Sequence, residues 1–137
     1  MSYRFREEPP TPGEYVALRE AAGMKPRTEA AARRGLPDST YAVTVRTPET
    51  AELVGMGRFV GDGGCFYQLV DIAVHPDHQG RGLGTQIVEA LLEYLRENAP
   101  PSAYATLISD VDEFYDRFGF EDAKPESKGM FARVRDL

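Results

Sequence analysis

Residues 65–95 read CFYQLVDIAVHPDHQGRGLGTQIVEALLEYL, and this stretch decides the fold. Its first part, Cys65 to Val74, is apolar on both alternating faces apart from Gln68 and Asp71, which is typical of a central strand covered by helices on each side. After a glycine-rich loop, apolar residues recur at helical spacing from Leu83 until two prolines end the helix. The stretch therefore predicts a buried strand, a loop and an amphipathic helix in succession.

Upstream of this stretch, capping and turn residues predict two short helices and further strands. Thr11, Pro12 and Glu14 have the spacing of a capping box with proline in the first turn, so a helix starts there. Thr28 caps a second short helix, with Gly35 as its left-handed stop. The expected strands of this half are Tyr3–Arg6, Ser39–Arg46 and Glu52–Val60. Short turns join the last two of them to residues 65–74 as an antiparallel meander.

The expected downstream elements are a strand over Ala103–Ile108, a helix over Val111–Phe118, and a last pair of strands, Phe120–Ala123 and Met130–Val134. A strand, helix, strand passage that follows an antiparallel meander implies a mixed sheet with helices on both faces and a right-handed crossover. The length of 137 residues fits one domain. The predicted fold is a single domain of α/β or α+β class, covering residues 1–137.

Composition narrows the function. Hydrophobic residues make up 42% and charged residues 28%, enough for a packed core and a soluble surface. Lys and Arg number 16 against 22 Asp and Glu, and the resulting net charge of −6 argues against nucleic-acid binding. No segment approaches the roughly 20 apolar residues that span a bilayer, so we expect no membrane partner. A cationic small molecule or a peptide amine suits this charge better.

Cys65 is the single cysteine and cannot form an intramolecular disulfide. The N-terminus, MSYRFREEPP, lacks the apolar core of a secretory signal, so we expect a cytoplasmic protein. Cys65 could act as a nucleophile, but His75 and His78 are the only histidines, and both lie past it in a glycine-rich segment. We expect Cys65 to be a buried core thiol.

The loop His75–Gly84, HPDHQGRGLG, carries the candidate chemistry. Its three glycines let successive backbone N–H groups point into one space, and the first turn of the following helix adds N–H groups and a positive dipole end. Phosphate or pyrophosphate is the natural ligand of such a cradle. A tight strand-to-helix turn without a ligand is the alternative that glycine spacing alone leaves open.

Two nucleotide-binding motifs fit the loop poorly. A Walker loop needs Gly-Lys-Ser/Thr at its end, but Gly84 is followed directly by Thr85. A Rossmann fingerprint needs glycine or alanine at Thr85 and several more βα units, yet only 137 − 84 = 53 residues follow Gly84.

The run VDIAVHPDHQGRGLG resembles the acetyl-CoA-binding motif of the GNAT superfamily of N-acetyltransferases, in which Gln or Arg is followed by two residues, Gly, one residue, and Gly or Ala. Gln79, Gly82 and Gly84 fill this pattern. The run FYDRFGF, Phe114 to Phe120, resembles the later motif of the same family, with Tyr115 four residues before Gly119. The resemblance covers residues 39–134 and is thinnest over residues 1–38.

The resemblance implies a splayed sheet in which the strand ending at Val74 and the strand starting at Ala103 diverge around the pantetheine arm of acetyl-CoA. The pyrophosphate would lie on residues 79–84. The implied acetyl-CoA-binding residues are Ile72, Ala73, Val74, Gln79, Gly80, Arg81, Gly82, Leu83, Gly84 and Thr85. Acetyl-CoA is a cosubstrate in this family, and no metal is implied.

Catalytic candidates follow from the same resemblance. Tyr115 matches the family's usual proton donor, and a neutral phenol can protonate the departing thiolate. Gln68 occupies a position where some members carry a glutamate or histidine base, and an amide cannot accept the proton. Asp71 is the only acid inside the strand, where it could deprotonate the amine through water or serve as a structural carboxylate. Strand alternation puts Asp71 opposite Gln68 unless a bulge shifts the register.

Other polar residues receive local roles. Ser109 or Asp110 could replace an asparagine that often touches the CoA arm, although a helix N-cap is the simpler role for both. His75 and His78 are assigned to neither metal nor catalysis. Four residues form a basic patch, namely Lys25, Arg27, Arg33 and Arg34. This patch could contact an acidic part of the acceptor or the phosphates of CoA, or it could be a helix face exposed to solvent.

Two functions remain open from the sequence. One is an acetyl-CoA-dependent N-acetyltransferase that acts on a primary amine of a small molecule or peptide by direct attack. The other is a noncatalytic acyl-CoA-binding or interaction module of the same fold. The expected partners are acetyl-CoA and an amine acceptor, and the sequence leaves open a homodimer, in which a second copy of the chain is the partner.

Overall fold

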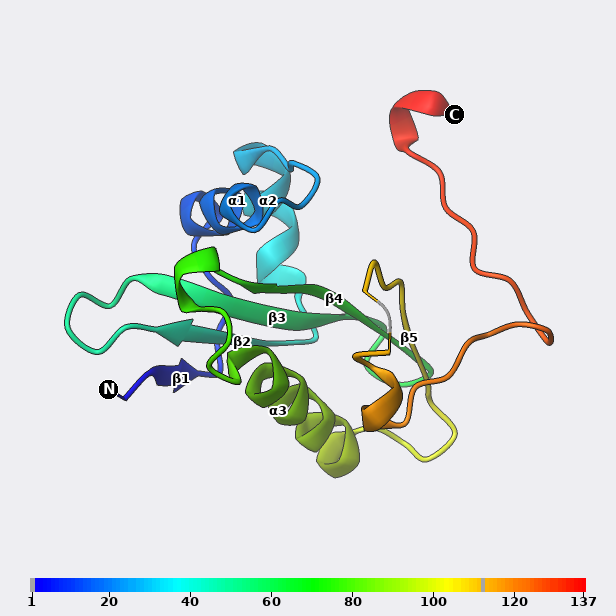
Figure 1. The fold of residues 1–137 in the computed structure, drawn as a ribbon. Helices are drawn as coiled ribbons and strands as arrows, with labels where there is room; N and C mark the ends of the chain where they lie inside the picture. The colour runs from blue at the N-terminus through cyan, green and yellow to red at the C-terminus, as the bar shows by residue number, and fades with distance from the viewer. Residues whose placement is uncertain (1, 112) are drawn as a thin grey trace. The chain divides into compact units, whose positions relative to one another are not determined.

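The computed structural model describes residues 2–111 and 113–137. A mixed sheet with strand order β1-β2-β3-β4-β5 forms its centre (Figure 1). β2, β3 and β4 form the predicted antiparallel meander, and β5 pairs parallel to β4, as the predicted crossover implies. β1 adds to the edge antiparallel to β2. The strands are β1 (Arg4–Arg6), β2 (Tyr41–Arg46), β3 (Leu53–Gly61), β4 (Phe66–Val74) and β5 (Tyr104–Leu107). The helices are α1 (Pro12–Ala21), α2 (Glu29–Gly35) and α3 (Leu83–Asn98).

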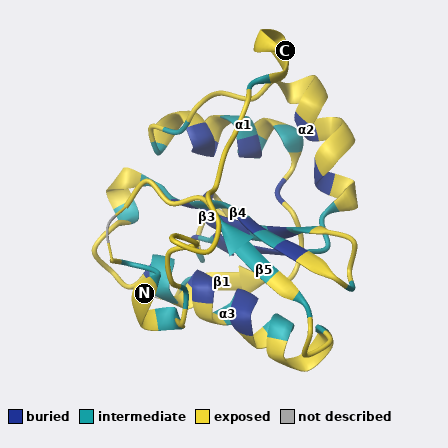
Figure 2. Ribbon diagram, turned by 90° about the vertical axis from the view of Figure 1, so that its right-hand side faces the viewer, coloured by how far each residue is buried: buried dark blue, intermediate teal, exposed yellow. Residues whose placement is uncertain are grey.

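The helices cover both faces of the sheet, which confirms the mixed-sheet prediction. Figure 1 shows α1 and α2 on one face and α3 on the other, and in Figure 2 the buried bands of the helices turn toward the strands. On the α1 face, Tyr15 and Leu18 pack in one buried cluster with Met56 and Ala73. Burial of such apolar side chains is the main term that stabilises the fold.

On the other face of the sheet, α3 packs closely against β3. A Cβ atom built at Gly57 of β3 would lie 2.6 Å from Cδ1 of Ile72 and 2.7 Å from Cγ2 of Ile87. Since real Cβ contacts are longer than this, only glycine at position 57 lets α3 approach so closely. The start of α3 is thereby fixed relative to the carboxyl end of β4.

The capping box of α1 is confirmed. The Glu14 amide donates to Oγ1 of Thr11 at 3.3 Å, and the Thr11 amide donates to Oε1 of Glu14 at 3.1 Å. The Glu14 carboxylate also accepts two hydrogen bonds from the Arg46 guanidinium, at 2.6 and 2.8 Å. This bidentate pair ties the start of α1 to the end of β2.

Two local predictions were wrong. Gly35 has a right-handed φ of −86° and lies inside α2, because the chain passes directly into a 3-10 turn over Leu36–Asp38 and needs no left-handed stop. Cys65 is exposed and not part of the core. Its turn is built by the Asp62 carboxylate, which accepts from the amides of Gly64, Cys65 and Phe66 and places Cys65 before the buried strand.

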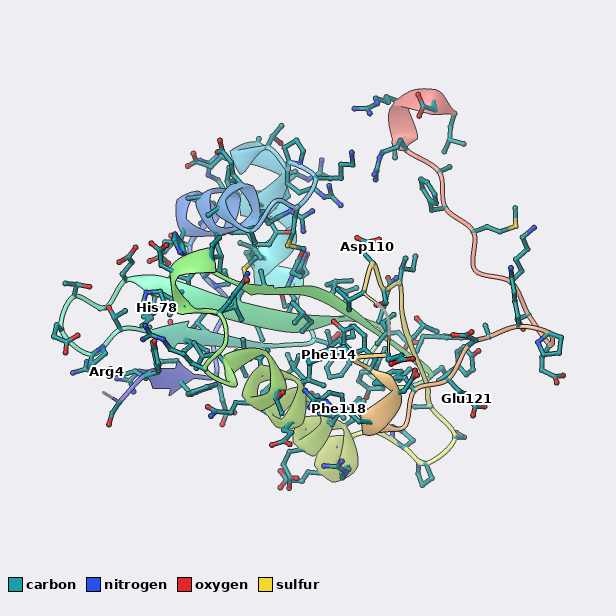
Figure 3. All side chains as sticks on the ribbon, in the orientation of Figure 1. Arg4, His78, Asp110, Phe114, Phe118 and Glu121 are labelled. Atoms are coloured by element: carbon teal, nitrogen blue, oxygen red, sulfur yellow. The ribbon has the colours of Figure 1, made fainter. Side chains whose placement is uncertain are left out.

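The described residues up to Leu107 form one compact unit, and those from Ile108 to Leu137 form another. In the second unit the predicted helix Val111–Phe118 is reduced to a 3-10 turn over Asp116–Phe118, and Asp112 lies outside the described residues. Phe114 and Phe118 lie beside one another there, with ring centroids 5.4 Å apart (Figure 3).

The predicted strands Phe120–Ala123 and Met130–Val134 are absent from the described residues of the second unit, and a 3-10 turn over Val134–Asp136 ends the chain. The side chains of Met130 and Phe131 are 80% and 76% exposed. The residue types of these segments favour strands, but a strand is stable only when its backbone is hydrogen-bonded to a neighbouring strand. The local sequence does not show whether such a neighbour exists.

Candidate functional site

The loop between β4 and α3 is built by local hydrogen bonds and two left-handed glycines. Nδ1 of His75 accepts from the Asp77 amide at 3.1 Å within a 3-10 turn over Pro76–His78. The Gln79 side-chain amide donates back to the Val74 carbonyl at 3.0 Å. Gly80 and Gly82 both have φ of +79°, a conformation that other residues rarely adopt, so glycine is strongly favoured at these positions.

This loop can receive an anion at its outer surface. The N-cap of α3 is Gly82, which has no side chain to accept a hydrogen bond from the N–H groups of the first helical turn. A Cβ built at Gly80 or Gly82 would meet no heavy atom within 4 Å, so the space beside both glycines is open. The loop leads into the N-terminus of the 16-residue α3, where the positive end of the helix dipole lies. These features fit the pyrophosphate of acetyl-CoA.

The sheet opens next to this loop. β4 and β5 pair from Phe66 opposite Tyr104 to Leu69 opposite Leu107, where β5 ends. The second half of β4, Val70–Val74, extends past the last residue of β5. This half has no β5 partner and leads directly into the glycine loop, which is the divergence that the resemblance implies.

The predicted acetyl-CoA-binding residues are contiguous in this region. On β4, Ala73 is buried under α1, and Cδ1 of Ile72 points to the α3 face beside Gly57. On α3, Leu83 is buried, whereas Gly84 and Thr85 are half-buried in the first turn. The exposed residues of the loop are Gln79, Gly80, Arg81 and Gly82. The structure thus brings all the predicted positions together around one strand-to-helix junction.

A β-bulge interrupts β4 at Asp71. Met56 of β3 pairs with Ala73, whereas Arg58 pairs with Val70, so β4 carries one more residue than β3 between these pairs. Asp71 has a left-handed φ of +62°. The extra residue turns the Asp71 side chain to the face of Arg58, which is also the face of Gln68 because Val60 pairs with Gln68. The bulge is the exception that the sequence left open, and because of it Asp71 shares the face of Gln68.

The Asp71 carboxylate is buried among three donors. Its side chain is 6% exposed and accepts from the Tyr15 hydroxyl at 2.9 Å, Nη1 of Arg19 at 2.5 Å and Nε of Arg58 at 2.7 Å. The Cζ atoms of Arg19 and Arg58 each lie 5.8 Å from the centroid of the Tyr15 ring. Burial and the Asp71 charge raise the pKa of the Tyr15 hydroxyl, so it stays a donor.

Arg19 extends this cluster into the loop after α1. Its Nε and Nη2 donate to the Lys25 carbonyl at 3.0 and 2.6 Å. Sequence reasoning missed Tyr15, Arg19 and Arg58. An arginine inside the apolar strand LVGMGRFVG was the available signal, because a cation there needs an acidic partner.

Tyr115 belongs to the second unit, where it is the N-cap of the 3-10 turn Asp116–Phe118. Its ring packs edge-on against Phe114 and Phe120, with centroids 4.9 and 6.2 Å away. Burial raises the pKa of the Tyr115 hydroxyl above its usual value. The side chain is therefore a protonated phenol at neutral pH.

The chain matches the family model described as "Acetyltransferase (GNAT) family" over residues 5–120. The protein belongs to the GNAT family. A solved structure, described as a "Probable Acetyltransferase" of unknown function from meticillin-resistant Staphylococcus aureus, is 39% identical, with a TM-score of 0.90. That similarity covers 97% of this chain and all of the other.

Two other similar proteins extend the comparison. The curated chloroplastic GCN5-related N-acetyltransferase 2 of Arabidopsis thaliana is 38% identical over 95 residues, which are 69% of this GNAT chain and 36% of the plant protein. The chain thus spans about a third of that relative. A Brucella melitensis GNAT protein solved with acetyl-CoA shares the fold at 24% identity and a TM-score of 0.65, over 88% of this chain and 84% of that one.

Several candidate residues of this GNAT chain have local contacts. Oγ of Ser109 accepts from the Val111 amide at 3.1 Å and donates to the Val111 carbonyl at 2.8 Å, so Ser109 shapes a loop and caps no helix. Nδ1 of His78 lies 2.8 Å from the Tyr3 hydroxyl. In the basic patch, Arg33 pairs with Glu29 at 3.2 Å on an exposed helix face.

The described residues contain neither a candidate metal site nor a membrane-spanning helix. Residues 2–111 and 113–137 hold no group of three His, Cys, Asp or Glu side chains placed to bind a metal ion. None of the described helices is long and apolar enough to cross a bilayer.

Proposed function

We propose that the protein transfers the acetyl group of acetyl-CoA to a primary amine of a small molecule or peptide. The observation that carries this proposal is the junction of the open half of β4 with the left-handed glycine loop at the N-terminus of α3. Membership of the GNAT family and the acetyl-CoA complex of the Brucella relative support the cosubstrate.

In this proposal the pyrophosphate binds the backbone N–H groups of residues 79–84, and the pantetheine arm runs along Ile72–Val74. Anion binding there uses the dipole of α3 and the open space beside Gly80 and Gly82. The Val74 carbonyl already accepts from Gln79, so Gln79 acts by closing the loop onto the strand. The negative overall charge of −6 favours an acceptor that arrives as a cation.

The proposed reaction is direct attack. The acceptor, which arrives as an ammonium ion, first loses a proton to solvent water. The neutral amine then adds to the thioester carbonyl, the C–S bond breaks, and the thiolate takes the proton of Tyr115, the donor that the family motif implies. The phenolate then regains a proton from the nitrogen, which releases one as the amide forms. Burial raises the pKa of Tyr115, so its hydroxyl holds this proton at neutral pH.

The structural role of Asp71 is the one that its contacts support. Both carboxylate oxygens accept from Tyr15, Arg19 or Arg58, and the side chain is 6% exposed. A base that acts through water needs an accessible oxygen, and this carboxylate is enclosed. We propose that Asp71 holds the β4 bulge, with its alternative role as a base tested by the variant described in the Discussion.

The same observations favour one competing function. With Gln68 on β4 and the Asp71 oxygens occupied, the strand offers no accessible carboxylate to remove a proton from the amine. A noncatalytic acyl-CoA-binding module is therefore the alternative.

Release of free CoA thiol across a panel of amines separates the two functions. The panel contains polyamines, amino sugars, aminoglycosides and peptides with free N-termini. Thiol release from acetyl-CoA is measured with each amine, once with the unsubstituted protein and once with the Gly82→Asp variant as the control. We expect amine-dependent thiol release that the variant lacks. Stabilisation by acetyl-CoA without thiol release for any amine would support the binding module.

A cytoplasmic location and a homodimer remain predictions. Cell fractionation tests the first, and sedimentation velocity of the purified protein tests the second.

A further inference from the structure

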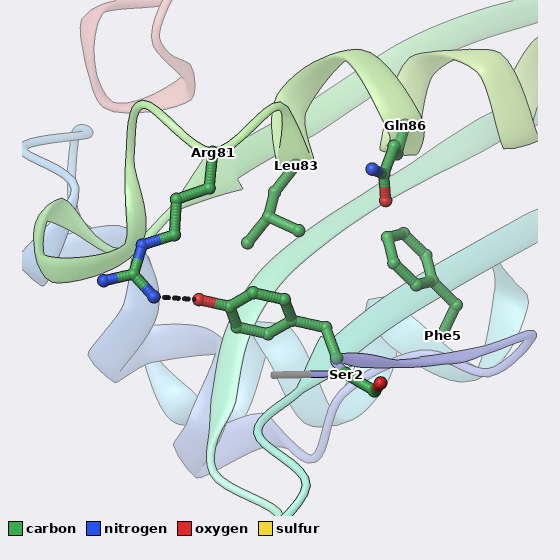
Figure 4. A pocket seen from close by; sticks show the side chains of 6 residues that line it. Ser2, Phe5, Arg81, Leu83 and Gln86 are labelled. Atoms are coloured by element: carbon green, nitrogen blue, oxygen red, sulfur yellow. Dashed lines mark hydrogen bonds between the residues drawn. The ribbon is translucent and has the colours of Figure 1, made fainter.

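The N-terminal segment reaches the acetyl-CoA loop through one side chain. Tyr3 directly precedes β1, which pairs with β2 through Arg4–Arg6. Nη1 of Arg81 donates to the Tyr3 hydroxyl at 2.7 Å, and the same hydroxyl lies 2.8 Å from Nδ1 of His78. Figure 4 shows the Arg81 side chain reaching across to this segment, with the hydrogen bond dashed.

The Tyr3 ring adds a second contact with the loop. It meets the His78 ring edge-on at a centroid distance of 5.6 Å. Tyr3 therefore holds one residue on each side of Gly80. The two partners are 75 and 78 residues away in sequence, so only the tertiary fold brings them to Tyr3.

The two halves of the loop differ in how they are held. The first half is fixed by contacts close in sequence, namely the His75 side chain on the Asp77 amide and the Gln79 side chain on the Val74 carbonyl. The second half contains the left-handed Gly80 and Gly82, whose φ of +79° gives the chain more freedom in the absence of restraint. Arg81, which donates the hydrogen bond to Tyr3, stands between these two glycines in the sequence.

We infer that Tyr3 is a positioning residue for acetyl-CoA binding: its hydroxyl joins His78 to Arg81 and holds the loop in the conformation that receives the pyrophosphate. This inference rests on the proposed function. Preorganisation of this kind strengthens binding because the loop loses less conformational entropy when the ligand arrives. The role requires no contact between Tyr3 and acetyl-CoA.

The pocket beside Tyr3 fits this assignment. It is an open hollow of about 540 Å³ lined by Ser2, Tyr3, Phe5, Arg81, Leu83 and Gln86. Arg81 and Leu83 flank the N-cap Gly82, so the hollow lies against the start of α3. Loss of the hydroxyl would leave the Arg81 guanidinium free to move into this hollow.

Replacing Tyr3 by phenylalanine tests the inference while keeping the ring against His78. We expect the KM for acetyl-CoA to rise about 3- to 10-fold, the equivalent of one hydrogen bond, with kcat and the KM for the amine unchanged. Tyr94→Phe is the matched control, since it removes a tyrosine hydroxyl from the far half of α3 and should change neither constant.

A double-variant cycle identifies the partner. If Tyr3 acts through Arg81, the Tyr3→Phe substitution should have little further effect in an Arg81→Met background, so the two effects should not add. Fully additive effects on the KM for acetyl-CoA would overturn the role of Arg81 and with it the inference.

Backbone nitrogen-15 relaxation of the ligand-free protein tests the ordering without relying on acetyl-CoA. In Tyr3→Phe, the order parameters of residues 79–83 should fall below those of the unsubstituted protein, and those in the middle of α3 should be unchanged. Equal order parameters in the two proteins would overturn the inference, whatever acetyl-CoA does. If the unsubstituted protein neither binds acetyl-CoA nor releases thiol, the proposed function fails, and the inference fails with it even where the order parameters change.

Discussion

Asp71 combines a strained backbone with a paired charge. Its φ of +62° belongs to a region that asparagine and aspartate tolerate better than other residues with a side chain. Its carboxylate accepts from two arginines and one tyrosine that come from α1 and β3. The residue therefore links the bulge of β4 to both neighbouring elements.

Asp71→Asn tests the structural role, because asparagine tolerates the same φ and keeps the shape, but removes the charge and turns one accepting oxygen into a donor. We expect the free energy of unfolding in urea to fall by about 1 to 3 kcal/mol, since the buried Arg19 and the half-buried Arg58 lose their counter-ion. Turnover of the remaining folded protein should be nearly unchanged. Asp38→Asn, at an exposed position, should change stability by less than about 0.5 kcal/mol.

A base role for Asp71 makes a different prediction for the same variant. Stability would change little, turnover would fall, and the loss would shrink at high pH, where the amine is already neutral. That pattern would replace the structural assignment. Unchanged stability together with unchanged turnover would show that Asp71 is neither base nor anchor.

Tyr115→Phe tests the proton donor. Loss of a positioned general acid lowers turnover by roughly 10- to 10⁴-fold, and the affinity for acetyl-CoA should be retained because the ring is kept. Turnover and acetyl-CoA titration of the same preparation measure the two effects. Full activity would mean that water protonates the thiolate and that Tyr115 only packs against Phe114 and Phe120.

Glu14 gives the fold a dependence on acid. The hydrogen bonds from Arg46 lower the pKa of Glu14 from 4.5 to about 2. Because the folded pKa is depressed, its contribution is complete above pH 4.5 and is lost as the pH falls toward 2. Partial exposure of the pair screens it, so we expect this contribution to be about 1 kcal/mol.

Urea unfolding between pH 6 and 3 measures that contribution. Glu14→Gln should flatten the decline of stability with falling pH, whereas Glu20→Gln, on the exposed side of the same helix, should follow the unsubstituted protein. Equal slopes for all three proteins would show that the Glu14–Arg46 pair does not stabilise the fold.

Elements with local signals were predictable from the sequence. The capping box of α1 and the apolar periodicity of α3 depend on residues within one or two turns of each other, and both were confirmed. The strands of residues 120–134 lacked such support, because strand formation depends on a distant partner. The same reason explains Cys65, whose exposure is set by the turn that Asp62 organises.

The glycine loop can be tested as an element by a pair of substitutions at Gly82. Asparagine and aspartate are nearly equal in size and both tolerate positive φ, so they differ mainly in charge. Gly82→Asp should abolish thermal stabilisation by acetyl-CoA, because it places a negative charge at the N-terminus of α3 beside the pyrophosphate. Gly82→Asn should retain part of it. Equal loss in both variants would show that bulk or backbone strain, and not charge, disrupts the cradle.

For the molecule as a whole, the predicted part of the candidate site is the part that is continuous in sequence. Residues 72–85 follow one another along a strand, a loop and a helix, so a motif can mark them. The residues that were missed, Tyr3, Tyr15, Arg19 and Arg58, come from β3, α1 and the segment before β1. Only the tertiary fold brings them to the strand and loop, and no spacing along the chain records those contacts.

Acetyl-CoA should stabilise the whole protein against unfolding. A ligand that binds only the folded state adds RT ln(1 + [L]/Kd), which is about 2.7 kcal/mol at a hundredfold excess over Kd. For a chain of 137 residues, each kcal/mol raises Tm by roughly 2 to 8 °C. Differential scanning fluorimetry should therefore show a clear increase in Tm with millimolar acetyl-CoA and with CoA.

ATP and NAD should give smaller shifts, because they supply phosphates to the glycine loop but no pantetheine arm for Val70–Val74. An unchanged Tm with millimolar acetyl-CoA would overturn the assignment of the loop, whereas equal shifts with ATP would mean that the loop binds phosphates and the open half of β4 contributes nothing.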